Sequence, residues 1–87
     1  MGLDLKIFKN RVRAIVVYFE LGEPWWFRLV DLRSNKTLCK DFVRNRTKLH
    51  HYKHVESVLT EFEEWLEERR RDGKHLRFPR PNSVPPI

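Results

Sequence analysis

Three histidines lie close together in this 87-residue sequence as His50-His51-x-x-His54, and their type and spacing come nearest to a reactive site. Two imidazoles three or four residues apart on a helix can ligate one metal ion. A complete metal site needs further ligands, but no acidic residue lies at a partner spacing and Cys39 falls in a predicted strand. We therefore interpret these histidines as a polar helix start and predict neither a metal nor a cofactor.

Other residue types that serve in catalysis are isolated in the sequence. Ser34, Ser57 and Ser83 lie in a predicted turn, on a polar helix face and near the C-terminus, and none has a base at motif spacing. The three glycines are too far apart to form a phosphate-binding loop. We predict no catalytic residue and a protein that is not an enzyme; a histidine serving as the general base of a small nuclease is the alternative.

Basic residues interleaved with aromatic residues are the strongest functional signal in the chain. Lysine and arginine bind phosphates, while aromatic rings stack on bases. The predicted nucleic-acid contacts are Arg11, Arg13, Arg28, Lys40, Arg44, Arg46, Lys48, Arg69, Arg70, Arg71 and Lys74. In the competing interpretation, Trp26 and Tyr18 are buried in a dimer and the cations only solubilise its rim.

The net charge of +6 is unevenly distributed along the chain. Residues 1–54 hold twelve Lys/Arg against five Asp/Glu, residues 55–68 hold six Glu and no base, and residues 69–87 hold six Lys/Arg against one Asp. The sequence therefore predicts a basic body with one acidic helix face. Such a balance favours nucleic acid, a nucleoprotein or an acidic protein surface as partner.

Length and composition predict one small globular domain. A hydrophobic content of 40% with 34% charged residues is typical of a folded protein. No apolar run approaches the roughly 20 residues of a membrane span, and the first ten residues lack the apolar core of a signal peptide. The single cysteine, Cys39, indicates a reducing compartment, so we expect a cytoplasmic protein without membrane contact.

A long amphipathic helix is predicted over residues 48–71. Its apolar residues recur at helical spacing along one face. They are Val55, Val58, Leu59, Phe62, Trp65 and Leu66. Thr47 is the expected N-cap and Asp72-Gly73 the stop signal.

Three β-branched and aromatic runs precede this helix and are predicted to be strands. They span residues 13–21, 25–32 and 37–44, and residues 6–9 are either a short extra strand or a lead-in. The expected fold is α+β, a three-stranded antiparallel meander with the helix packed on one face. The expected division is a lead-in or short strand at 1–12, a βββα domain at 13–73 and an extended basic Pro-rich tail at 74–87.

The register is predicted from burial of the large apolar residues. A three-residue turn, Gly22 to Pro24, pairs Val17 with Leu29, and the next turn pairs Phe27 with Phe42. The predicted helix-facing surface is Ile15, Val17, Phe19, Leu21, Trp25, Phe27, Leu29, Leu38 and Phe42. The opposite face would carry Ala14, Val16, Tyr18, Glu20, Trp26, Arg28, Val30, Leu32, Cys39, Asp41 and Val43.

That opposite face is too apolar for an open surface and should be covered. Its predicted partner-binding residues are Val16, Tyr18, Trp26, Val30 and Val43. A second copy or another protein is the expected cover, and the Pro-rich tail is the alternative. A homodimer is therefore predicted.

The meander, the helix ending at Asp72-Gly73 and the exit Phe78-Pro79-Arg80-Pro81 together resemble the HicB-like antitoxin fold. The resemblance covers the layout of residues 13–83. Val30-Asp31-Leu32 lies where that family has an aspartate-leucine pair, although Arg33-Ser34 replaces the family's Pro-Gly and family members tend to be acidic. The resemblance implies a dimeric antitoxin or regulator that binds a partner.

The sequence therefore predicts a small regulatory protein that binds nucleic acid or a ribonucleoprotein through a basic surface. The alternative is a protein–protein interaction factor, such as an antitoxin or a phage-type inhibitor. It would act through the apolar sheet face or the acidic helix face. Salt separates the two, because phosphate binding weakens steeply with salt and apolar contacts hardly respond.

Overall fold

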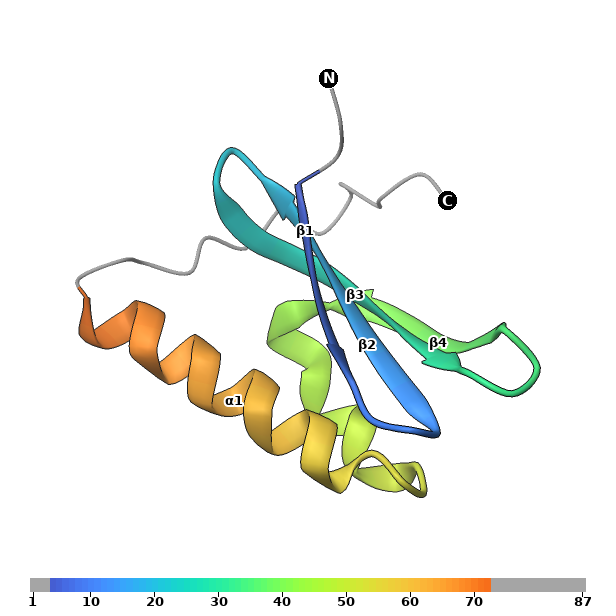
Figure 1. Ribbon diagram of the computed structural model, residues 1–87. Helices are drawn as coiled ribbons and strands as arrows, with labels where there is room; N and C mark the ends of the chain where they lie inside the picture. Colours follow the sequence, from blue (N-terminus) through green and yellow to red (C-terminus); the bar gives the residue numbers. More distant parts are fainter. Residues whose placement is uncertain (1–3, 73–87) are drawn as a thin grey trace.

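The computed structural model describes residues 4–72, which form an antiparallel sheet with two helical segments on one of its faces (Figure 1). The elements are β1 (Leu5–Lys9), β2 (Arg13–Glu20), β3 (Glu23–Asp31), β4 (Lys36–Phe42), the 3₁₀ segment η1 (Val43–His51) and α1 (Glu56–Arg71). The sheet order is β1-β2-β3-β4, so each strand pairs with its neighbour in sequence. The predicted tail at 74–87 lies outside the described residues.

The α+β class and the C-terminal helix are confirmed, but the sheet has four strands rather than three. Leu5–Lys9 is the extra strand, and it pairs antiparallel with β2. Phe8 faces the core at 7% exposure, whereas Leu5 and Ile7 on the other side of the strand are 45% and 52% exposed. This alternation is the burial pattern of an edge strand with one side against a core.

The β2–β3 turn differs from the predicted three-residue turn. Leu21 and Gly22 are its two central residues, with φ of 52° and 79°, as a type I′ hairpin turn requires. The pairing is Val17 with Phe27, and a bulge follows Tyr18. From Arg13 to Tyr18, each β2 residue pairs with a β3 residue two positions earlier than predicted. Because side chains alternate between faces, a shift of two residues leaves each side chain on its predicted face. At the tip the prediction is wrong, because Leu21 is 91% exposed.

The pairing of β4 is shifted by one residue from the prediction. Cys39 pairs with Leu29, and Phe42 pairs with Trp26. Because side chains alternate between faces, a one-residue shift moves each one to the other side of the sheet. Cys39 therefore packs against the core, and Phe42 joins the face opposite the helices. The predicted faces of three other residues are also wrong. Leu38 was expected to face the helix but is exposed. Asp41 and Val43 were expected on the opposite face, but Asp41 pairs with Phe27 and Val43 is fully buried.

The predicted helix over 48–71 is two segments, and only α1 is α-helical. His54 adopts φ of 64°, which a continuing right-handed helix cannot contain. Asn10 holds this break in place, since its Nδ2 donates to the His54 carbonyl at 2.9 Å and to Ser57 Oγ at 3.1 Å. Val55 is the N-cap residue, so the prediction of Thr47 as cap is wrong.

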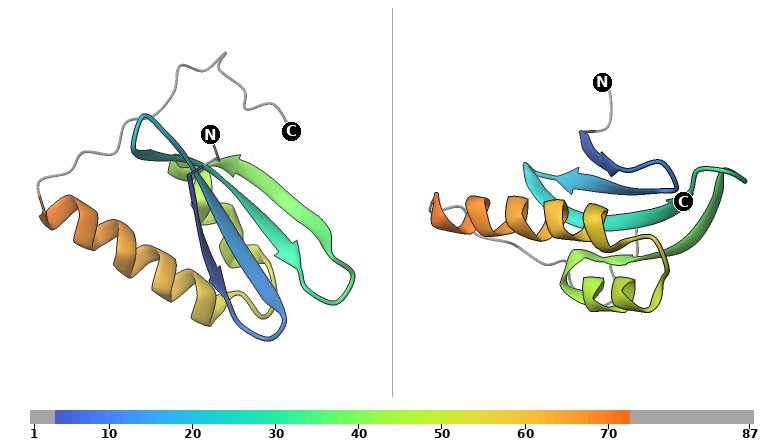
Figure 2. Two further views of the ribbon diagram at one scale, coloured as in Figure 1. Left: turned by 45° about the horizontal axis from the view of Figure 1, so that its top comes forward. Right: turned by 60° about the horizontal axis from the view of Figure 1, so that its bottom comes forward.

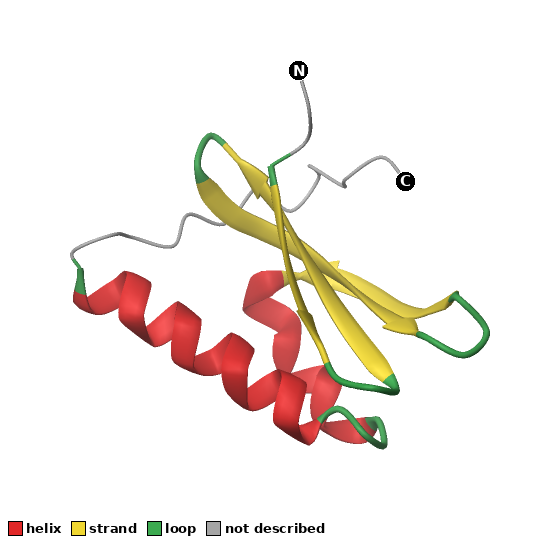
Figure 3. Cartoon of the chain, in the orientation of Figure 1, coloured by secondary structure: helices red, strands yellow, loops and turns green. Residues whose placement is uncertain are grey.

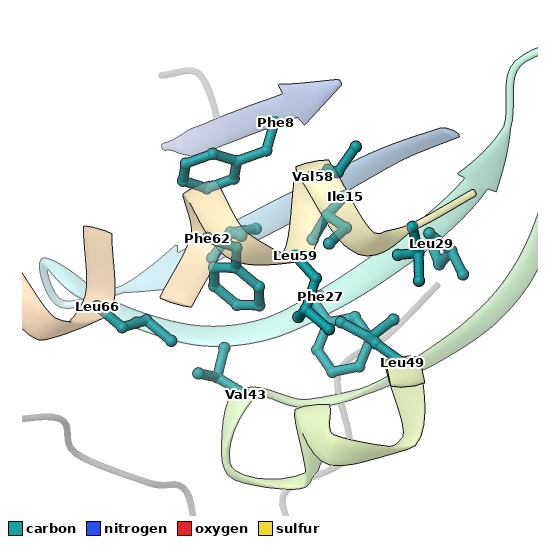
Figure 4. Close-up of a cluster of buried hydrophobic side chains, with 12 residues drawn as sticks. Phe8, Ile15, Phe27, Leu29, Val43, Leu49, Val58, Leu59, Phe62 and Leu66 are labelled. Atoms are coloured by element: carbon teal, nitrogen blue, oxygen red, sulfur yellow. The ribbon is translucent and has the colours of Figure 1, made fainter. Parts of the chain in front are cut away.

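The core lies between the sheet and the two helical segments (Figure 4). Phe27 and Leu29 of β3 and Phe62 of α1 are fully buried. Leu49 of η1 is also fully buried, and η1 packs against β3 and β4. The predicted helix face is confirmed, although Trp65 is only partly buried, with its ring 5.5 Å from that of Phe8. Each fully buried large apolar side chain contributes about 1.5–3 kcal/mol.

Candidate nucleic-acid interface

The face of the sheet opposite the helical segments is the candidate site, and we call it the outer face. In the described chain both η1 and α1 pack on the other side, as the layered view in Figure 2 shows. Strand pairing arranges the outer face in three rows of four residues. The rows are Leu5, Tyr18, Trp26, Phe42; then Ile7, Val16, Arg28, Lys40; then Lys9, Ala14, Val30, Thr37.

Three aromatic residues occupy neighbouring strands in the first row. The Tyr18 and Trp26 rings are stacked, with centroids 4.1 Å apart and planes 10° from parallel. Phe42 is the pairing partner of Trp26, and the Arg44 guanidinium lies 5.5 Å from the Phe42 ring centre. Trp26 is 8% exposed, while Tyr18 and Phe42 are half-buried. The row therefore places three aromatic side chains on three neighbouring strands, and we call it the aromatic strip. Tyr18 and Trp26 stack on one another, while the Phe42 ring lies 6.1 Å from the ring of Trp25.

Two cations lie side by side in the next row. Arg28 and Lys40 are Cα partners on β3 and β4. Arg28 Nη1 donates to Thr37 Oγ1 at 3.1 Å, and its buried Nε has no acceptor within the described residues. Lys40 is exposed, and neither cation has an ion-pair partner among residues 4–72. Their charge is available to a ligand.

No acidic residue occurs among the twelve residues of the outer face. Lys9 adds a third exposed cation at the β1 edge. Local positive charge without carboxylates favours an anionic ligand. Two copies joined through this face would hold like charges against one another, so the outer face does not suit the predicted homodimer.

Five of the predicted nucleic-acid contacts are engaged within the protein. The ion pairs are Arg13–Asp31, Arg46–Glu63 at 3.0 Å, Lys48–Asp41 at 2.6 Å, Arg69–Glu23 at 3.7 Å and Arg70–Glu67 at 2.6 Å. In the Lys48–Asp41 pair, hydrogen bonding and proximity to Asp41 raise the pKa of the Lys48 ammonium. Four of these pairs join different elements, whereas Arg70–Glu67 lies within α1, and the five cations do not converge on one surface.

The remaining predicted contacts divide into two groups. Arg28 and Lys40 lie on the outer face, and Arg44 adjoins it through Phe42. Arg11 lies in the turn between β1 and β2, and Arg71 lies in the last turn of α1, so neither belongs to the outer face. Lys74 is outside the described residues. The structure thus gathers three of the predicted cations around the aromatic strip.

Four of the five predicted partner-binding residues lie on the outer face. Val16 and Val30 are 7% and 6% exposed and form a small cluster with Ala14 and Tyr18. Trp26 adjoins this cluster through its stack on Tyr18. Val43, the fifth, was predicted wrongly, because the chain leaves β4 after Phe42 and turns the Val43 side chain into the core.

Sequence reasoning missed Lys9, Thr37 and Phe42 as members of this surface. Lys9 lies on the outer face only because Leu5–Lys9 forms a strand. The alternation of apolar and charged residues over Leu5–Lys9 was the pattern that could have predicted this strand. Phe42 and Thr37 depend on the β3–β4 register, which an irregularity after Leu29 shifts. No local pattern in the sequence marks that bulge.

On the opposite side of the molecule, the solvent side of α1 carries a row of acidic residues. Exposed carboxylates follow α1, a helix that lies in a separate layer from the sheet (Figure 3). They belong to Glu56, Glu61, Glu64, Glu67 and Glu68. The positive outer face and the negative helix face are therefore separated by the thickness of the two layers.

The histidines do not converge on a ligand set. His50 and His51 are exposed at the end of η1, and His54 lies in the link to α1. Residues 4–72 contain no group of three or more His, Cys, Asp or Glu side chains positioned to hold a metal ion. None of the helices in this part of the chain combines the length and apolar character needed to cross a membrane.

Comparison of the chain with models of known protein families, with curated proteins and with solved structures found no match. The geometry of the outer face is therefore the basis on which a function is inferred for this chain.

Proposed function

We propose that this chain is a non-enzymatic protein that binds single-stranded nucleic acid, alone or within a ribonucleoprotein, through its outer face. One observation carries the proposal. The aromatic strip of Tyr18, Trp26 and Phe42 lies directly beside the cations Arg28 and Lys40. None of the twelve residues in these rows is acidic, and Glu20, the next outer-face residue of β2, lies beyond the aromatic row. Aromatic rings and cations in adjacent rows suit the bases and phosphates of one strand.

Single strands are favoured over duplexes because stacking needs exposed base faces. In a duplex the base faces are covered by neighbouring base pairs, whereas an unpaired base can lie on an aromatic ring. Each such stack contributes about 1–3 kcal/mol and tolerates any base. We therefore expect weak sequence preference and a regulatory role through occupancy of the strand. The single Cys39 supports a cytoplasmic location for this role.

The test is a titration by fluorescence anisotropy with labelled single strands of about 12 nucleotides, within the length range of single-strand sites. RNA, DNA and a duplex of the same sequence are compared between about 50 and 200 mM salt. We expect both single strands to bind more tightly than the duplex. The double variant Arg28→Ala/Lys40→Ala should bind more weakly, with a log–log salt slope shallower by about 1.4, because two contacts are lost.

The matched control is Arg70→Ala/Arg71→Ala, which removes the same charge at the end of α1. It should retain most of the affinity and the salt slope if the outer face is the site. Equal losses in the two double variants would show that only net charge matters. A wild-type protein that binds no single strand at low salt would contradict the proposal.

A second candidate function has its own support in β1. This strand is one edge of the sheet, and its outer-face side chains, Leu5 and Ile7, are 45% and 52% exposed. An extended segment of another protein could add to this edge, with main-chain hydrogen bonds and apolar pockets for alternate side chains. The chain would then be an antitoxin-like interaction factor. Partner binding that persists unchanged at high salt would favour this candidate.

A further inference from the structure

The tip of the β2–β3 hairpin presents an unusual residue to solvent. Leu21 is 91% exposed, more than any other large apolar residue in the described chain. Its φ of 52° lies in the left-handed region, which Asn and Gly adopt more readily than Leu. Leu is therefore unfavourable here both for its backbone and for its solvation, which points to a contact that residues 4–72 of one copy do not make.

A pocket of about 470 Å³ opens beside this tip, between β1, the hairpin and α1. It is lined by Asp4, Leu5, Lys6, Phe19, Gly22 and Trp65. The Phe19 and Trp65 rings meet edge to face, 5.7 Å apart, and form an aromatic wall, with the Arg69 guanidinium over both rings and the Lys6 ammonium over Trp65. The pocket is large enough for one leucine side chain, but the exposed side chain of Leu21 does not occupy it.

We propose that two copies of the chain associate through this end of the molecule, with Leu21 of each copy inserted into the pocket of the other. A two-fold interface requires a surface patch that is complementary to itself. Here the protruding residue and the pocket are adjacent, since Gly22 follows Leu21 and also lines the pocket. One two-fold axis between them would therefore fill both pockets at once.

The charges at this end are also self-complementary. Asp4 and Lys6 both line the pocket, so rotation about a two-fold axis can bring the carboxylate of one copy to the ammonium of the other. On the outer face, Arg28 and Lys40 would instead meet their own copies. The hairpin end thus suits a homodimer and leaves the outer face open to nucleic acid.

The experiment is sedimentation velocity over a concentration series, without nucleic acid. The wild-type protein should shift from monomer to dimer as concentration rises. Leu21→Asn should raise the dissociation constant at least about tenfold, because each dimer loses the burial of two leucines, one from each copy. Asparagine tolerates the left-handed conformation, so this variant should be folded and melt no lower than the wild-type monomer.

Leu38→Asn is the matched control, because Leu38 is an exposed leucine on β4 away from the hairpin tip. It should dimerise like the wild type. A wild type that remains monomeric at the highest concentration, or a Leu21→Asn variant that dimerises normally, would overturn the proposal. The Arg28→Ala/Lys40→Ala variant should still dimerise, so failure of this interface and failure of nucleic-acid binding can be distinguished.

Discussion

The Trp26 indole lies flat on the Tyr18 ring, with the centroids 4.1 Å apart and the planes 10° from parallel. The two residues are direct partners across β2 and β3, immediately before the bulge that follows Tyr18. Parallel stacking across a strand pair restricts both side chains to one conformation. The outer face is thereby given a fixed aromatic surface at its centre.

The stack should be measurable as a coupling free energy. In a double-mutant cycle with Tyr18→Leu and Trp26→Leu, we expect a coupling of about 0.5–1.5 kcal/mol in the free energy of unfolding. Leucine keeps apolar bulk on the face, so the cycle isolates the ring–ring term. Urea unfolding of the four proteins provides the values. Additive effects would mean that the two rings do not stack in solution.

Leu38 and Cys39 are neighbours in β4, but substitution by lysine should destabilise the protein only at Cys39. Leu38 is exposed, whereas Cys39 pairs with Leu29 and packs against the core. Leu38→Lys should change the free energy of unfolding by less than about 0.5 kcal/mol. Cys39→Lys should cost about 1–3 kcal/mol, because a long charged side chain would have to fit where the thiol packs against the core. The reverse order, measured by urea unfolding, would restore the register predicted from sequence.

Stability should fall in acid partly through Asp31. Its carboxylate accepts hydrogen bonds from the Ser34 hydroxyl at 2.8 Å and the Ser34 N–H at 3.0 Å, and it pairs with Arg13. These contacts hold the pKa of Asp31 below its ordinary value of 3.8. The stabilisation is therefore complete above the unfolded pKa and is lost as pH falls through the lower folded pKa.

Urea midpoints between about pH 6 and pH 2 test this dependence. The Asp31→Asn variant should be less stable than wild type near neutral pH and should show a flatter acid limb. Some acid dependence should remain, since hydrogen bonds also lower the pKa of Glu67, through Arg70. An acid limb as steep as that of wild type would exclude the Asp31 contribution.

Replacing His54 with glycine should stabilise the fold. His54 has φ of 64°, a conformation that glycine adopts without steric cost. We expect His54→Gly to raise the free energy of unfolding by up to about 1 kcal/mol, although glycine also adds entropy to the unfolded chain. His51→Gly is the control and should destabilise slightly. Destabilisation at position 54 would indicate that its imidazole makes a contact that matters.

The parts of the fold that sequence predicted were those with a strong period. The stripe from Val55 to Leu66 identified the buried face of α1, and the β-branched run of β2 identified a central strand. The split between η1 and α1 was hidden, because Leu49 and Val55 continue an apolar pattern across His54. The side chain that supports this break, Asn10, is 44 residues away from His54.

Sequence predicted the candidate site correctly only where the position of a side chain depended on alternation within a single strand. Alternation along β3 placed Trp26 and Arg28 on the same face correctly. Phe42 was assigned to the wrong face, because a single bulge decides which side of β4 it occupies. Ion pairing was equally non-local: Arg46 and Glu63 are 17 residues apart, and nothing near either residue identifies its partner.

The separation of charge between the outer face and α1 has a kinetic consequence. Residues 4–42, which form the sheet and its turns, hold eight Lys/Arg against five Asp/Glu, whereas residues 43–72 of the helical layer hold seven of each. The net positive charge of the described chain therefore lies on the sheet side, which gives the molecule an electric dipole across its thickness. In the field of a polyanion this dipole experiences a torque that turns the sheet forward before contact. Encounters would begin in the productive orientation, so the association rate would exceed that of a molecule with the same net charge spread evenly.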